Sequence, residues 1–115
     1  MPPPTLEDRL LDILDVIGEI DDMLKGISFE RFEADMMLRM ATERCLEILC
    51  RGARRLPDEV RKGAQGIDWR RINDFATLLR NAYHATSVDV VWNIVQDHVP
   101  PLKAFVELRV RTASK

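Results

Sequence analysis

Apolar residues recur three and four positions apart along most of this 115-residue chain, and this pattern constrains the fold more than any other feature. Such spacing places the apolar side chains on one face of an α-helix. No segment alternates apolar and polar residues over a useful length, apart from a brief β-branched run at 88–91. The sequence therefore predicts an all-α fold, an up-and-down bundle of four to six helices with short connections.

Capping and helix-breaking residues give the expected ends of these helices. Gly26 is expected to end the first helix, and Ser28 and Asp68 are expected to cap the second and third. Asp89 is expected to cap a fourth helix, which the Pro-Pro pair at 100–101 should break. A short turn can begin at Pro57. The expected helices cover about residues 5–25, 28–56, 69–84, 90–98 and 102–111.

Several residues of these helices have both a structural and a functional interpretation. Met36, Met37 and Met40 favour core packing, although methionines also form adaptable binding surfaces. Trp69 and Trp92 favour packing in the core or at a dimer interface over stacking on nucleic-acid bases. His98, next to Pro-Pro, is interpreted as a residue at a helix end.

Composition indicates one globular domain, residues 1–115, with 46% hydrophobic and 31% charged residues. No apolar run approaches the ~20 residues that cross a bilayer, and the start lacks the features of a signal peptide, so a cytoplasmic location is expected. Cys45 and Cys50 are about 500° of helical rotation apart. They are expected to be small buried apolar residues and not a disulfide or a zinc pair.

Charge is distributed unevenly along the chain. Residues 1–36 contain ten acidic and three basic residues, whereas residues 37–115 contain nine acidic and fourteen basic residues. An acidic and a basic side would allow a polyanion to bind on one side only. For most of these charges we favour simple solvation of helix faces, and a functional role only near Arg80.

The stretch from Ile67 to Leu102 contains Asp-Trp near its start, Arg-Asn-Ala-Tyr-His at its centre, and Val-Val-Trp-Asn followed by Pro-Pro-Leu. In this order and spacing, these elements resemble the C-terminal half of the HEPN-domain, HepT-like ribonuclease toxins. The resemblance implies a helical bundle of the HEPN type. Shorter matches extend it over almost the whole chain, at residues 9–14, 35–39, 43–48 and 54–57.

The family motif is an Arg, four residues, a His, one residue and a Tyr. With the Trp and Pro-Pro-Leu landmarks aligned, Asn81 occupies the His position, Ala76 the Arg position and Tyr83 the Tyr position. The resemblance implies cleavage of RNA without a metal or other cofactor, in a cleft shared by two protomers. His would act as the base for the ribose 2′-hydroxyl and Arg would hold the phosphate. Asn81 cannot act as that base near neutral pH, and Ala76 cannot hold a phosphate.

Residues beside Asn81 can replace part of this chemistry. Arg80 and His84 are four positions apart, so they lie on one helix face as a basic, titratable pair. The alternative is that Arg80 forms a surface ion pair and His84 caps the helix end. By resemblance, Tyr83 is the residue to which a partner minimal nucleotidyltransferase (MNT) adds AMP; alternatively, it packs its ring and hydrogen-bonds its hydroxyl.

The function predicted from the sequence is that of a HepT-like toxin component of a HEPN/MNT toxin–antitoxin system. The expected partners are a second copy of the chain, an MNT antitoxin and RNA. No association with a membrane is expected. Three hypotheses about its activity stay open. The chain is an RNase that uses Arg80 and His84, a non-catalytic module that binds RNA or nucleotide, or a protein-interaction subunit that pairs with a nucleotidyltransferase.

Overall fold

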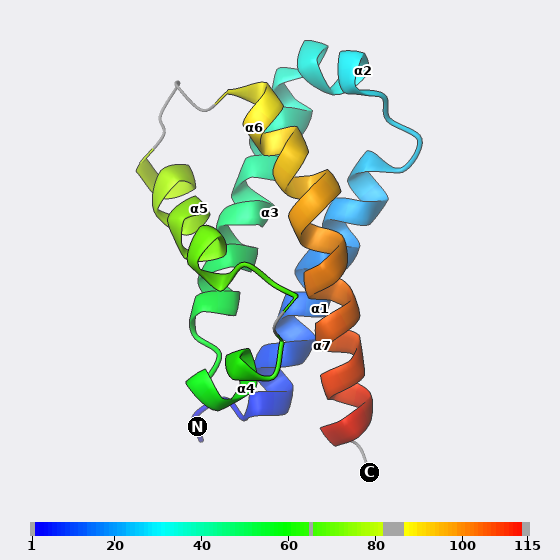
Figure 1. Cartoon of the computed structure of the whole chain (residues 1–115). Helices are drawn as coiled ribbons and strands as arrows, with labels where there is room; N and C mark the ends of the chain where they lie inside the picture. The colour runs from blue at the N-terminus through cyan, green and yellow to red at the C-terminus, as the bar shows by residue number, and fades with distance from the viewer. Residues whose placement is uncertain (1, 65, 82–86, 114–115) are drawn as a thin grey trace.

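The computed structural model describes residues 2–64, 66–81 and 87–113 (Figure 1). The regular elements in these ranges are all helical, which confirms the expected all-α class. None of the helices described is long and apolar enough to cross a membrane. The elements are α1 (Leu6–Leu24), α2 (Phe29–Ala34), α3 (Met36–Arg54), α4 (Asp58–Lys62), α5 (Trp69–Asn81), α6 (Val88–Asn93), the π-helical turn η1 (Ile94–His98) and α7 (Val99–Ala113).

Helix α3 lies between α1 and α5 and packs against both, while α7 packs along α1 on another side of the bundle (Figure 1). The core follows the predicted helical spacing. In α1 the buried positions fall three, four and three residues apart, which keeps one face of the helix toward the core. The core side chains contributed by α1 and α3 are those of Leu10, Ile13, Ile17, Ile20, Leu46, Leu49, Cys50 and Ala53.

Both ends of α1 have a local cause. Thr5 and Asp8 form a capping box, in which each side chain accepts a hydrogen bond from the other residue's backbone N–H at 3.0 Å. The backbone N–H of Thr5, aided by its side chain, lowers the pKa of the Asp8 carboxyl below its ordinary value. Gly26 follows the helix with φ +72°, which confirms its expected role as the residue that ends α1.

The expected single helix from Ser28 to about Leu56 is wrong, because the chain breaks at Asp35. Ser28 caps α2 as predicted, accepting a hydrogen bond from the Arg31 N–H at 3.2 Å. Asp35 then adopts an extended conformation, with φ −107° and ψ 97°, and its carboxylate accepts from the Leu38 N–H at 3.0 Å. An Asp side chain competes with the backbone for such hydrogen bonds, so it starts a new helix here.

The expected burial of three methionines is also wrong. Met36, Met37 and Met40 are 63%, 82% and 60% exposed, respectively. The break at Asp35 places Met36 and Met37 in the first turn of α3, away from the face that carries the core residues of that helix. The methionines therefore form an exposed apolar cluster at the start of α3.

The cysteines of α3 are free thiols, in agreement with the prediction that they form no disulfide. Cys50 is buried, and burial raises the pKa of its thiol to about 12. Cys45 is half-buried, and burial also raises the pKa of its thiol. The expectation of a buried residue is thus confirmed for Cys50 and only partly for Cys45.

The expected break at Pro100 and Pro101 is wrong, because α6, η1 and α7 follow one another without a break. The Val99 N–H donates to the Ile94 carbonyl five residues earlier, so the helix widens into a π turn just before the prolines. This wider turn relieves the contact between a proline ring and the preceding turn of helix. Ser87, and not Asp89, precedes α6; Asp89 lies in its first turn.

Candidate functional site

The helix that carries the motif positions is α5, and its start is fixed by two side chains. Asp68 caps the helix as predicted, because its carboxylate accepts a hydrogen bond from the Arg71 N–H at 3.0 Å. The indole N–H of Trp69 donates to the Ala64 carbonyl at 3.2 Å. The Trp69 ring also meets Phe105 of α7 edge to face, with centroids 5.8 Å apart. These contacts confirm the predicted packing role of Trp69 and tie α5 to the bundle.

One face of α5 is buried and packs against α3, while the other is exposed. The buried face consists of Ile72, Phe75, Ala76 and Leu79. The exposed positions are Arg70, Arg71, Asn73, Asp74, Thr77, Leu78 and Arg80. The outer face of the motif helix is therefore polar, with three arginines and one aspartate.

Ala76, which the resemblance places at the motif's Arg position, is only 5% exposed. It lies on the core face of α5, beside Phe75 and Leu79. An arginine at this position would have to place its guanidinium in the core or displace α5 from α3. In this chain, position 76 therefore serves packing and supplies no cation to a cleft.

Arg80 and Asn81 lie at the end of α5. Arg80 is exposed, and its side chain forms no ion pair with the residues that the structure describes. Asn81 is the last residue of the helix. Tyr83 and His84 lie outside the described residues, so the predicted pair of Arg80 and His84 and the predicted modification site at Tyr83 stay predictions.

The contact between His98 and α5 was not predicted from the sequence. His98 belongs to η1, yet its ring meets the ring of Phe75 in α5, with centroids 5.1 Å apart and an angle of 75° between the planes. The interpretation of His98 as a residue at a helix end is wrong, because the helix continues into α7. The side of the helix on which His98 lies could have been predicted only by assuming that the helix continues without a break through Pro100 and Pro101.

The second tryptophan also packs inside the bundle. The Trp92 ring lies 5.1 Å from Phe32 and 5.7 Å from Phe29, measured between ring centroids. Both phenylalanines belong to α2, so these contacts join the start of the α6–α7 helix to α2. The predicted packing role of Trp92 is confirmed.

The chemistry available on α5 is limited by its residue types. Exposed arginines can bind a phosphate through several N–H donors. The segment Trp69–Asn81 contains no histidine, so this helix offers no group with an ordinary pKa near neutrality. Among the described residues, no group of three or more His, Cys, Asp or Glu side chains could hold a metal ion. Helix α5 itself can therefore bind an anion through its arginines but contributes no histidine as a base.

Similarity to known proteins identifies the family. Residues 13–108 match the family model described as "Ribonuclease HepT-like". The chain is 32% identical over 104 residues to "Probable ribonuclease HepT" of Thermococcus cleftensis, covering 90% of this chain and 94% of that protein. It is 27% identical over 99 residues to a protein of Methanocaldococcus jannaschii named as a "Putative RNase", covering 86% of this chain and 91% of the relative. No solved structure matches the chain at a significant level.

The family match and the all-α bundle together place this chain in the general class of HEPN-type helical domains. The chain belongs to the HepT-like ribonuclease family, and the family match spans every helix from the middle of α1 to most of α7. The family resemblance drawn from the sequence is confirmed.

Proposed function

We propose that this chain is the HepT-like component of a HEPN/MNT toxin–antitoxin system, and that it binds RNA along the exposed face of α5. The observation that carries the proposal is the outer face of this helix, where Arg70, Arg71 and Arg80 are exposed. Arginine binds phosphate with several parallel donors, and its charge does not depend on pH in the physiological range. The membership of the chain in a ribonuclease family supports RNA as the polyanion.

RNA cleavage by this scaffold needs a base that removes the proton of the ribose 2′-hydroxyl. The oxygen then attacks the adjacent phosphorus, and the bond from phosphorus to the 5′-oxygen breaks to leave a cyclic phosphate and a 5′-hydroxyl. Asn81, at the motif's His position, cannot accept that proton near neutral pH. We therefore propose that the scaffold binds RNA through its arginines and that its cleavage activity depends on whether His84 takes over the role of base.

The exposed cluster formed by Met36, Met37 and Met40 supports protein partners as well. Flexible thioether side chains on a surface typically form adaptable protein-binding sites. A second copy of the chain and an MNT nucleotidyltransferase are the partners that we propose, with Tyr83 as the residue that the latter modifies. Binding of these partners does not require RNA cleavage, so a chain without the motif histidine could still form both complexes.

RNA binding is tested by fluorescence anisotropy with a labelled single-stranded RNA at low and moderate salt. The Arg80→Ala variant should weaken binding and reduce the salt dependence, because one phosphate contact is lost. Arg31→Ala serves as a matched control, because Arg31 is an exposed arginine of α2, outside α5. The proposal is contradicted if the protein does not bind RNA at low salt, or if both variants bind as the unchanged protein does.

A further inference from the structure

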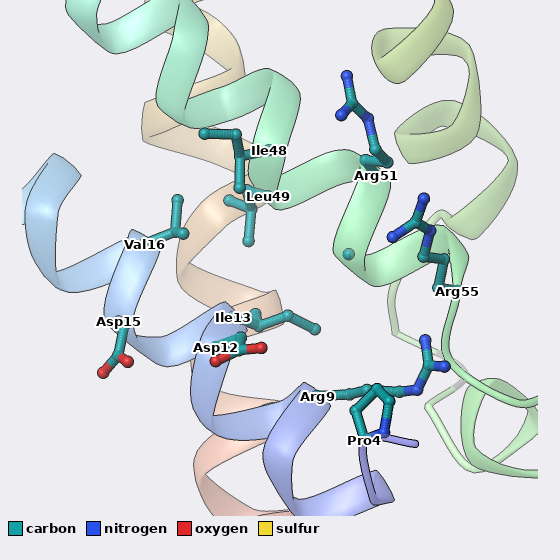
Figure 2. Close-up of a pocket in the computed structure, with 11 residues that line it drawn as sticks. Pro4, Arg9, Asp12, Ile13, Asp15, Val16, Ile48, Leu49, Arg51 and Arg55 are labelled. Carbon is teal, nitrogen blue, oxygen red and sulfur yellow. The ribbon is translucent and has the colours of Figure 1, made fainter. Parts of the chain in front are cut away.

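A groove runs between α1 and α3, with a cavity volume of about 450 Å³ (Figure 2). This volume is in the range of sites that hold small organic ligands. No residue of α5 lines the groove, so it is separate from the motif helix. The lining residues used below come from α1, from α3 and from Arg55, which follows α3 directly.

One side of the groove is basic. Figure 2 shows the side chains of Arg9, Arg51 and Arg55 along the same side; Arg9 belongs to α1, Arg51 to the last turn of α3, and Arg55 follows α3. The structure gives the guanidinium groups of Arg9 and Arg55 no ion-pair partner among the residues it describes. Two unpaired cations and a third beside them are a favourable place for an anion with several acceptor oxygens.

Arg51 is already held in place by a neighbour. Its guanidinium donates to Glu47 at 2.6 Å, and the same carboxylate accepts from Arg44 at 3.0 Å. One carboxylate is thus shared by two arginines, and Arg51 keeps further N–H donors for a ligand. The ion pair positions Arg51 without neutralising the basic side of the groove.

The floor and the opposite side of the groove have a different character. Ile13, Ile48 and Leu49 form an apolar floor between the two sides, and Asp12 and Asp15 lie on the side opposite the arginines (Figure 2). A Cβ atom at Gly52 would lie 3.4 Å from a side-chain carbon of Ile13, so α1 and α3 are in ordinary van der Waals contact at the groove. A ligand that fits this groove carries a negative group at one end, a flat or apolar body, and hydrogen-bond donors at the other end.

We propose that this groove binds one nucleotide unit, with its phosphate on Arg9, Arg51 and Arg55. The base lies over the apolar floor, where a planar guanidinium can also stack on it. Its amino group donates to Asp12 or Asp15. The nucleotide is either free in solution or part of a single-stranded RNA, and the chemistry of recognition is the same in both cases. The site does not depend on the proposed role of α5.

The test is a binding titration by calorimetry at low salt with the whole chain. The ligands are AMP, adenosine, UMP and a short single-stranded oligoadenylate. AMP should bind more tightly than adenosine, which lacks the phosphate, and than UMP, whose base has no amino group for the carboxylates. Binding of AMP identifies a free nucleotide as a ligand, whereas binding of the oligonucleotide alone identifies the site as one for RNA; either result supports the proposal.

Variants of two adjacent arginines provide the matched control. Arg55→Glu should weaken binding roughly tenfold or more, because a charge-assisted contact is replaced by repulsion. Arg54→Glu should leave binding nearly unchanged, because Arg54 is exposed on the same helix but does not line the groove. Replacing both Asp12 and Asp15 by Leu should reduce the preference for AMP over UMP, because the acceptors of the amino group are then lost. Thermal unfolding checks that each variant is folded, and Arg9→Ala provides a second test of the basic side.

Three results would overturn the proposal. The first is equal weakening by Arg54→Glu and Arg55→Glu, which would indicate attraction by overall charge. The second is equal binding of AMP and adenosine, which would exclude a role for the phosphate. The third is the absence of binding by AMP and by the oligonucleotide at low salt.

Discussion

His98 of the π-helical turn η1 packs its ring against Phe75 of α5, with ring centroids 5.1 Å apart at an angle of 75°. This contact links the helix that carries the motif positions to the segment just before Pro100 and Pro101. The π turn just before the prolines therefore determines the side of the helix on which His98 lies, and that side faces α5.

This contact should contribute measurably to the stability of α5 in the bundle. Edge-to-face aromatic pairs are worth about 0.5–1.5 kcal/mol beyond their burial. A double-mutant cycle with His98→Ala and Phe75→Leu, followed by urea unfolding, should give a coupling free energy in this range. Strictly additive effects of the two substitutions would show that the rings pack without a specific interaction.

Restoring arginine at position 76 should not rebuild the motif. Ala76 is 5% exposed on the core face of α5, so Ala76→Arg should lower the free energy of unfolding by about 1–3 kcal/mol or more from overpacking alone. Thr77→Arg is the control, because Thr77 is exposed on the same helix and its replacement should change stability by less than about 0.5 kcal/mol. Equal stability of the two variants would contradict the placement of Ala76 in the core.

The capping box of α1 should make stability depend on pH. Hydrogen bonds from Thr5 lower the pKa of Asp8 in the folded chain, so the ionised carboxylate stabilises the fold. This contribution is present above the ordinary carboxyl pKa of the unfolded chain and is lost as the pH falls through the lowered folded value. Urea unfolding at neutral and acidic pH should show a smaller loss in Asp8→Asn than in the unchanged protein. An identical loss in both would exclude a contribution from Asp8.

The two cysteines should differ in reactivity toward a thiol reagent at about pH 8. Burial raises the pKa of Cys50 to about 12, so little reactive thiolate forms and the reagent cannot reach it without opening of the fold. The pKa of half-buried Cys45 is also raised, yet its side chain is partly accessible. Labelling of Cys50→Ser should therefore be faster than labelling of Cys45→Ser. Faster labelling of Cys50 would contradict its burial.

The helical class and most helix ends could be predicted from the sequence, because they depend on local spacing and on caps such as Ser28, Asp68 and Gly26. The errors arose where a local signal had two possible meanings. The helical spacing predicts Asp35 within a helix, but Asp35 starts a new one, and the methionines that follow it lie outside the core. Pro100 and Pro101 predict a helix break, because no local pattern in the sequence indicates the π turn that precedes them.

The alignment of Ala76 with the motif's Arg position stays a prediction from the sequence, and the burial of Ala76 could not be predicted from it. The location of Ala76 on the core face depends on which side of α5 meets α3. The groove between α1 and α3 was not predicted, because Arg9 and Arg55 come from distant parts of the chain. Their positions on the same side follow from the packing of two helices, which no local pattern specifies.

The most direct test of the central claim is cleavage of a labelled, structured RNA in the presence of EDTA, with the unchanged protein and the Asn81→His variant side by side. The account predicts that Asn81→His cuts the RNA and leaves a cyclic phosphate, because the substitution places a base where the resemblance aligns the motif's histidine. Cutting by the unchanged protein that is lost in His84→Ala would assign the base to His84. If Asn81→His does not cut the RNA, the proposed cleft with Asn81 at the histidine position is contradicted.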